Sequence, residues 1–268
     1  MDKTTVKRFV KMSIPPIMLF LARQTYNYFA TEKDDRTKTE KELITAVNKR
    51  FPDESVRCSK PGLHHRTYRN MEYIVLEDVV CPSHYSNFKF LEYLMSKVAR
   101  ENDVVLDICD GAGAVGFPLL CEKGVRSVMF VDVSDQAIRS IRETARLNKI
   151  QNIQTLLSEG LKSLPTSEKF DVIVANPPVD GHRLTPTLIS LAGGDPGFTF
   201  HRQFFKEVHN YLKEDGRICF VEDNCFTTPS QFKEMVGSNP CLEFVKSERL
   251  DRRYFIILVT LKEVMRSK

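Results

Sequence analysis

The chain has 268 residues, of which 42% are hydrophobic and 28% charged, and its formal net charge is +4. This composition is ordinary for a globular protein and excludes a largely disordered or low-complexity chain. The seven cysteines include no CxxC pair and no Cys/His spacing typical of zinc, so we expect unpaired thiols, a cytoplasmic protein and no metal site.

The first 62 residues predict a small helical domain. The apolar run 14–22 is too short to cross a bilayer, and no small-residue cleavage site follows it, so we expect neither a membrane span nor a signal peptide. Thr39 with Glu42 forms a capping box for a second helix. Residues 63–82 are rich in β formers and predict a hairpin linker.

Residues 83–268 predict one α/β domain. Apolar strand patterns alternate with helical ones and fall at 104–108, 127–133, 153–157, 170–175 and 217–222. Ser134 and Thr228 can cap two of the helices, and a third is expected over 199–212 with Gly216 just past its end. The tail predicts a closing antiparallel pair, 242–246 with 254–261. Together these patterns predict a Rossmann-like, mostly parallel sheet with helices on both faces.

A glycine-rich turn, DICDGAGAVG, follows the first strand of this domain. Its glycines fit GxGxxG, which alone is a weak signal for a dinucleotide. Asp107 at the strand end and Asp110 in the turn would repel a pyrophosphate, whereas they suit a cation. S-adenosylmethionine (AdoMet) carries an ammonium group and a sulfonium but no phosphate. The turn therefore predicts AdoMet rather than NAD.

Two further carboxylates follow neighbouring strands. Asp132 ends the second strand, where a carboxylate can accept hydrogen bonds from both ribose hydroxyls. The alternative is a carboxylate that only caps its own turn. We expect Asp132 and the adjoining Val133 to border the cofactor. Glu159 follows the third strand and is either a contact of the adenine amine or a surface loop residue.

The fourth strand ends in Asn176-Pro177-Pro178. Because proline cannot continue a central strand, Asn176 is expected at the carboxyl edge of the sheet, beside the cofactor. The Asn176 side-chain oxygen and the Pro177 carbonyl can accept the two hydrogens of an NH2 group and aim its nitrogen at a methyl carbon. A plain strand terminator is the alternative. Asp180, His182 and Arg183 either line the acceptor pocket or form an ordinary polar loop.

These segments resemble class I AdoMet-dependent methyltransferases, above all the release-factor glutamine methyltransferases (the HemK/PrmC group). VLDICDGAG, VDVSDQAIRSIRETARLN, KFDVIVANPP and the stretch from GGDPG onward are similar to that group's motifs, over about residues 75–225. The resemblance implies the class I methyltransferase fold with a small N-terminal helical domain. It implies that Asp107, Gly111 and Gly113 hold the methionine part of AdoMet. Asp132 would hold the ribose and Glu159 the adenine, while Asn176 and Pro177 would hold the target nitrogen.

Two positions depart from that group. Cys109, which we also place in the cofactor site, stands where the group usually has glycine, a small change in what we expect to be a tolerant loop. Val179 follows Pro178 in the substrate site, where the group usually has an aromatic ring that stacks on a planar amide or base. Val179 predicts an acceptor less planar than the usual release-factor glutamine.

The leading interpretation is an AdoMet-dependent N-methyltransferase acting on a protein amide, as in the HemK group, or on a small amine-bearing molecule. A methyltransferase of RNA or DNA bases is the first alternative. Residues 1–75 favour it mildly, with 15 Lys and Arg against 9 Asp and Glu, but the sequence contains no known nucleic-acid module. A catalytically inactive AdoMet-binding protein is the second, and an NAD-dependent dehydrogenase the third.

Overall fold

The computed structural model describes residues 63–76, 79–80, 82, 85–178, 195–224 and 226–263. The chain divides into two compact units, Met1–Pro52 and Asp53–Lys268, and every described residue belongs to the second. The predicted N-terminal helical domain lies outside the described residues. The predicted domain limits at 62 and 82 stay a prediction.

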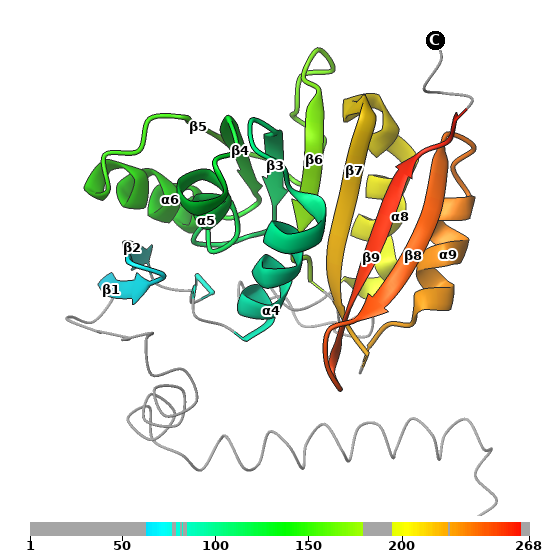
Figure 1. The fold of residues 1–268 in the computed structure, drawn as a ribbon, viewed down its shortest axis with the longest axis horizontal. Coiled ribbons are helices and arrows are strands. Elements are labelled where there is room, and N and C mark those ends of the chain that lie inside the picture. Colours follow the sequence, from blue (N-terminus) through cyan, green and yellow to red (C-terminus); the bar gives the residue numbers. More distant parts are fainter. Residues whose placement is uncertain are drawn as a thin grey trace, which may run out of the picture. The chain divides into compact units, whose positions relative to one another are not determined.

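Seven of the described strands form one sheet in the order β5-β4-β3-β6-β7-β9-β8 (Figure 1). Five of them are parallel: β3 (Val104–Ile108), β4 (Ser127–Asp132), β5 (Ile153–Leu157), β6 (Phe170–Ala175) and β7 (Leu212–Asp223). The sheet closes with an antiparallel pair, β9 (Tyr254–Leu261) and β8 (Leu242–Arg249). The predicted mostly parallel sheet with an antiparallel C-terminal pair is confirmed.

Helices cover both faces of the sheet because its strands are apolar on both sides. One face packs on α4 (Tyr85–Tyr93), α5 (Gly116–Pro118) and α6 (Asp135–Leu147), and the other on α8 (Thr199–Glu207) and α9 (Pro229–Gly237). Figure 1 shows the second pair behind β7, β9 and β8. Along β3, Val105 belongs to the first core and Leu106 to the second.

Capping residues set the helix boundaries as predicted. The Ser134 side chain accepts from the backbone amide of Ala137 at the start of α6, and Thr228 and Gln231 form a capping box at α9. The shorter helical segments are η1 (Leu94–Val98), η2 (Leu119–Lys123), η3 (Pro196–Phe198) and η4 (Val208–Tyr211). None of the described helices is long and apolar enough to cross a membrane.

A separate hairpin, β1 (Leu63–Tyr68) with β2 (Met71–Leu76), occupies the range where the sequence predicts one. Its outer edge is bound to α6. The backbone amide of Ile74 donates to Thr144 Oγ1, and that of Leu76 donates to Ser140 Oγ, both across 3.0 Å. These contacts hold the hairpin against α6.

The predicted helix over 199–212 is too long. The α-helix ends at Glu207, a 3-10 segment follows, and β7 begins at Leu212, so Gly216 lies inside a strand and not past a helix. A side chain at Gly216 would meet Leu212 Cδ2 at 2.7 Å and the Lys213 carbonyl at 2.8 Å. Pairing of β7 with β6 across a register shift extends the strand, and this long-range contact is not visible in the local sequence pattern.

Candidate active site

The carboxyl ends of β3 and β6 lie side by side. The chain leaves β3 for β4 and β5 and then returns to β6 on the other side of β3. The register pairs Ile108 with Ala175, so the turn that begins at Cys109 and the segment that begins at Asn176 leave the sheet from adjacent positions. Ligands of open α/β sheets bind at such a switch point.

Asp132 connects the end of β4 to the glycine-rich turn. Its Oδ2 accepts from the backbone amide of Gly111 at 3.3 Å, and its Oδ1 accepts from that of Ser134 at 2.9 Å. Burial raises the pKa of Asp132. Asp132 thus has the turn-capping role weighed as an alternative, yet a carboxylate offers about four acceptor positions, so two ribose hydroxyls can still bind.

Packing accounts for two glycines of the turn. A Cβ at Gly113, where φ is +85°, would lie 2.5 Å from the Phe117 ring, and one at Gly116 would lie 2.4 Å from the Phe130 ring. Gly111 has more room, with Val79 at 3.5 Å from the position of its Cβ. The predicted cofactor contacts of Gly111 and Gly113 stay predictions.

Cys109 has a φ of +63°, in the left-handed region where a residue other than glycine costs about 1–2 kcal/mol. The backbone is therefore less tolerant here than the sequence suggested, and glycine would fit it better. Burial raises the pKa of the Cys109 thiol well above its usual value, and the nearby carboxylates of Asp132 and Asp107 raise it further. The thiol stays protonated at neutral pH and is no nucleophile.

Asp107 and Asp110 form a buried acidic pair, 1% and 7% exposed. Asp107 Oδ2 and Asp110 Oδ1 have no hydrogen-bond partner in the described part of the chain, although Asp110 Oδ2 accepts from the Val115 amide at 2.7 Å. Burial raises the pKa of Asp107 well above its usual value and that of Asp110 to about 6. A buried acceptor without a partner costs about 1–3 kcal/mol. An ammonium group would supply the missing donors.

Exposed apolar side chains surround the same turn. Val80, Val133 and Leu157 are 42%, 56% and 51% exposed. Val80 lies against Gly111, while Leu157 pairs with Asp132 across β4 and β5, next to Val133. Apolar walls beside the Asp132 carboxylate would suit the adenosine part of AdoMet.

Glu159 follows β5, as predicted, but its side chain is 66% exposed and forms an ion pair with Lys162 at 2.7 Å. This arrangement matches the surface-loop alternative. A contact of Glu159 with adenine remains an untested prediction.

Asn176 is half-buried directly after β6, with Pro177 buried and Pro178 half-buried behind it. Its Nδ2 donates to Asn87 Oδ1 at 2.7 Å. Asn87, in α4, is 2% exposed, and its own Nδ2 donates to the Pro82 carbonyl at 3.4 Å. Asn87 was not identified from the sequence. The available signal was a polar residue on the apolar stripe of a helix, in line with the buried Phe90, Leu91 and Leu94.

Residues 89–247 match the family model of the methyltransferase small domain. The chain belongs to this methyltransferase family. The match covers more than half of the chain and includes the glycine-rich turn, Asp132 and the Asn176-Pro177-Pro178 segment. It confirms the predicted class of enzyme.

Known proteins similar to this methyltransferase agree with the fold. The release factor glutamine methyltransferase of Streptococcus pneumoniae is 26% identical over 203 residues, covering 71% of this chain and 70% of that protein. That of Fusobacterium nucleatum is 24% identical over 231 residues, covering 78% and 64%. A 16S rRNA methyltransferase of Thermus thermophilus, solved with AdoMet and guanosine, has a TM-score of 0.56 at 19% identity, over 75% of this chain and 50% of that one. The chain thus spans about two thirds of the length of these two curated relatives.

The remaining predicted substrate residues of this methyltransferase lie outside the described residues. They are Val179, Asp180, His182 and Arg183. Their roles stay predictions.

A buried ionic network lies at the same edge of the sheet and was missed from the sequence. His201 Nδ1 lies 2.6 Å from Asp195 Oδ2, and its Nε2 lies 3.1 Å from Glu222 Oε1. Burial alone would lower the pKa of His201, but Glu222 and Asp195 raise it to about 9. Because Phe220 pairs with Ala175, Glu222 lies just beyond the end of β6. The network joins α8 to the carboxyl end of β7.

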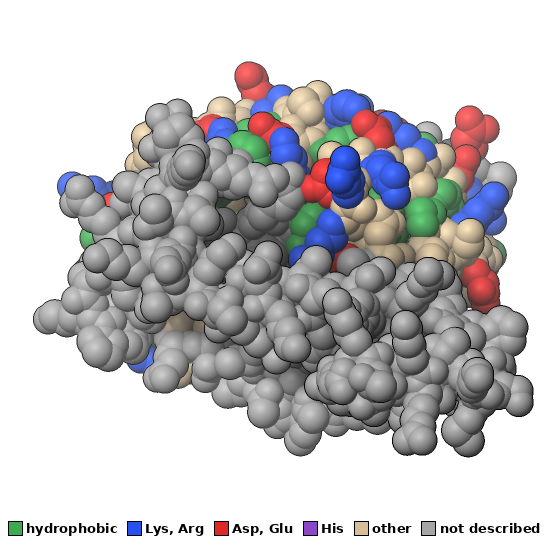
Figure 2. Space-filling model, turned by 90° about the horizontal axis from the view of Figure 1, so that it is seen from below, with side chains coloured by type: hydrophobic (Ala, Val, Ile, Leu, Met, Phe, Trp, Pro, Cys, Tyr) green, Lys and Arg blue, Asp and Glu red, His purple; other side chains and the backbone are tan. Residues whose placement is uncertain are grey.

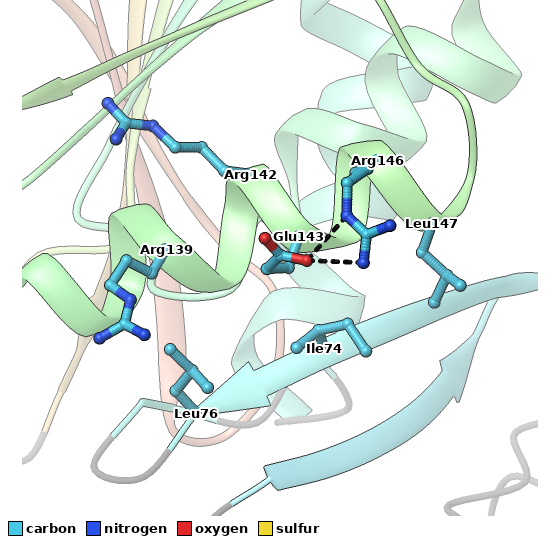
Figure 3. A pocket seen from close by; sticks show the side chains of 7 residues that line it. All are labelled: Ile74, Leu76, Arg139, Arg142, Glu143, Arg146 and Leu147. Carbon is cyan, nitrogen blue, oxygen red and sulfur yellow. Dashed lines mark hydrogen bonds and ion pairs between the residues drawn. The ribbon is translucent and has the colours of Figure 1, made fainter.

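A cavity of about 410 Å³ lies elsewhere, between β2 and α6 (Figure 3). Its lining combines aliphatic and charged side chains: Ile74, Leu76, Arg139, Arg142, Glu143, Arg146 and Leu147. No predicted site residue lines it, and Glu143 pairs with Arg146 across its wall. The predicted cofactor residues lie at the switch point between β3 and β6, and none of them lines this cavity.

Proposed function

We propose that this methyltransferase transfers the methyl group of AdoMet to the side-chain amide nitrogen of a glutamine in a protein. The observation that carries the proposal is the pairing of Ile108 with Ala175. This register brings the buried carboxyl groups of Asp107 and Asp110 and the amide of Asn176 to one edge of the sheet.

Different cofactor residues bind different parts of the AdoMet molecule. Asp107 and Asp110 hold the ammonium group, and Asp132 holds the ribose hydroxyls with Val133 beside it. AdoMet, when bound, supplies a methyl group that is already activated on a sulfonium. No metal is needed, and the described residues contain no cluster that could hold one.

Asn176 and Pro177 act on the acceptor. An amide nitrogen is a poor nucleophile because its lone pair is delocalised into the carbonyl. The Asn176 side-chain oxygen and the Pro177 carbonyl accept the two hydrogens of the amide NH2 and favour a pyramidal nitrogen aimed at the methyl carbon. The nitrogen–carbon bond forms as the carbon–sulfur bond breaks, and the nitrogen then loses one proton to solvent.

A protein glutamine is favoured as acceptor by the names of the curated relatives. The presence of Val179 instead favours a less planar amide or amine as the acceptor. Nucleic acid is less favoured because the sequence contains no known nucleic-acid module. On the described part of the face in Figure 2, Lys and Arg side chains are interspersed with Asp and Glu. A cytoplasmic site of action is part of the proposal, supported by four unpaired cysteines among the described residues, Cys109, Cys121, Cys219 and Cys241.

The test is a transfer assay with AdoMet labelled on its methyl group. Purified release factor, a panel of small amines and total RNA are offered in separate reactions, and mass spectrometry locates the label. Label on a glutamine amide nitrogen of the release factor supports the proposal. Label only on an amine or only in RNA contradicts it.

A further inference from the structure

We propose that Asn87 is a positioning residue that determines which end of the Asn176 carboxamide faces the acceptor nitrogen. This inference rests on the proposed function, because it concerns the same amide oxygen of Asn176. Asn87 lies in α4, 89 residues before Asn176, and is joined to it by the 2.7 Å hydrogen bond between their side chains.

Two hydrogen bonds, from Asn87 Nδ2 to the Pro82 carbonyl and from Asn176 Nδ2 to Asn87 Oδ1, form a relay. Its direction follows from the Pro82 carbonyl. The Pro82 carbonyl can only accept, so Asn87 must turn its NH2 group toward it. The Asn87 oxygen then faces Asn176, which must turn its own NH2 group toward that oxygen. The carboxamide oxygen of Asn176 is on the opposite branch of the group. The relay therefore selects one of the two possible amide orientations.

Burial makes the selection effective. Asn87 is 2% exposed, so water does not compete for its oxygen, and the flipped orientation of Asn176 would place two carboxamide oxygens against each other. The position itself lies on an apolar stripe with the buried Phe90 and Leu91. A buried amide is costly unless it is hydrogen-bonded, and here both of its ends are.

The correct orientation matters for the chemistry. When its oxygen faces the methyl acceptor, Asn176 accepts a hydrogen from the acceptor NH2 group. When its NH2 group faces the acceptor, Asn176 presents a donor to another donor and loses that contact. We expect loss of Asn87 to slow methyl transfer by about ten- to a hundredfold, as when one transition-state hydrogen bond is weakened, and to leave AdoMet affinity unchanged.

The experiment compares Asn87→Leu, which removes the relay, with Asn87→Asp, which keeps an acceptor for Asn176 Nδ2. The matched control is Asn239→Leu. Asn239 is 5% exposed, and its Nδ2 also donates to a backbone carbonyl, that of Phe205 at 2.8 Å. Single-turnover rates of methyl transfer from labelled AdoMet to release factor, Kd for AdoMet and Tm are measured for each variant and for Asn87→Leu in an Asn176→Ala background.

We expect Asn87→Leu to lower the transfer rate, Asn87→Asp to keep more of it, and Asn239→Leu to lower only Tm. In the Asn176→Ala background, Asn87→Leu should have no further effect, because it acts through Asn176. A full additional loss there, or a wild-type rate for Asn87→Leu, overturns the inference. If Asn176→Ala itself transfers at the wild-type rate, the proposed function fails instead. Should Asn87→Leu not fold, Asn87→Asp in both backgrounds decides the question.

Discussion

Gly111 donates its backbone N–H to Asp132 Oδ2 across 3.3 Å. This contact joins the turn after β3 to the carboxyl end of β4 and holds the Asp132 carboxylate at the edge of the predicted cofactor site. Under the proposed function, the ribose of AdoMet and the turn depend on the same side chain.

Asp132→Ala should weaken AdoMet binding at least about tenfold, because hydrogen bonds to a charged group contribute about 1.5–3 kcal/mol. Calorimetry measures the affinity, and circular dichroism checks that the variant is folded. Asp135→Ala is the control, since Asp135 is exposed in the first turn of α6. Equal affinities for wild type and a folded Asp132→Ala variant would refute the ribose assignment.

Asp107→Asn should stabilise the AdoMet-free protein while weakening AdoMet binding. Asp107 is buried and its Oδ2 lacks a partner among the described residues, so its charge costs stability until a cation arrives. We expect a Tm several degrees above wild type without AdoMet, and a smaller rise in Tm on adding it. A variant less stable than wild type, with unchanged affinity, contradicts this role.

AdoMet affinity should increase as pH rises from 5 to 7.5. Burial raises the pKa of Asp110 to about 6, so the free protein holds a proton there below pH 6, and binding of a cation expels it. The free energy of unfolding of the AdoMet-free protein should fall over the same rise in pH. A carboxyl whose folded pKa is raised stabilises the fold only while it is protonated. Calorimetry at pH 6 in two buffers of different ionisation enthalpy should detect proton release on binding. An AdoMet affinity that decreases as pH rises would contradict the prediction.

His201→Ala should lower the free energy of unfolding by about 3–5 kcal/mol, because it leaves Asp195 and Glu222 buried without their cation. The pKa of His201 lies at about 9, above its usual 6.5. Its contribution is therefore complete below pH 6.5 and is lost as pH rises through 9. Denaturant unfolding at pH 6.5 and 9.5 should show this loss in wild type and not in the variant. A pH-independent difference between the two proteins would argue that His201 is neutral.

The parallel strands were predictable because each is a short apolar run bounded by turn residues. The predicted limits of β3, β5 and β6 are those observed. The position of Asn176 at the carboxyl edge followed from the two prolines after it. Local patterns failed at β7, where pairing with β6 sets the strand's start. They also could not reveal the Asn87–Asn176 contact or the pairing of His201 with Glu222, because these pairs are far apart in the chain.

In the proposed reaction Asn176 positions the acceptor nitrogen, and the Asn176→Ala variant removes this contact. Kd for AdoMet and the single-turnover rate of methyl transfer to release factor are measured on the same preparation. We expect an affinity for AdoMet within a few-fold of wild type and a transfer rate lower by about a hundredfold or more. Transfer at the wild-type rate by this variant would contradict it.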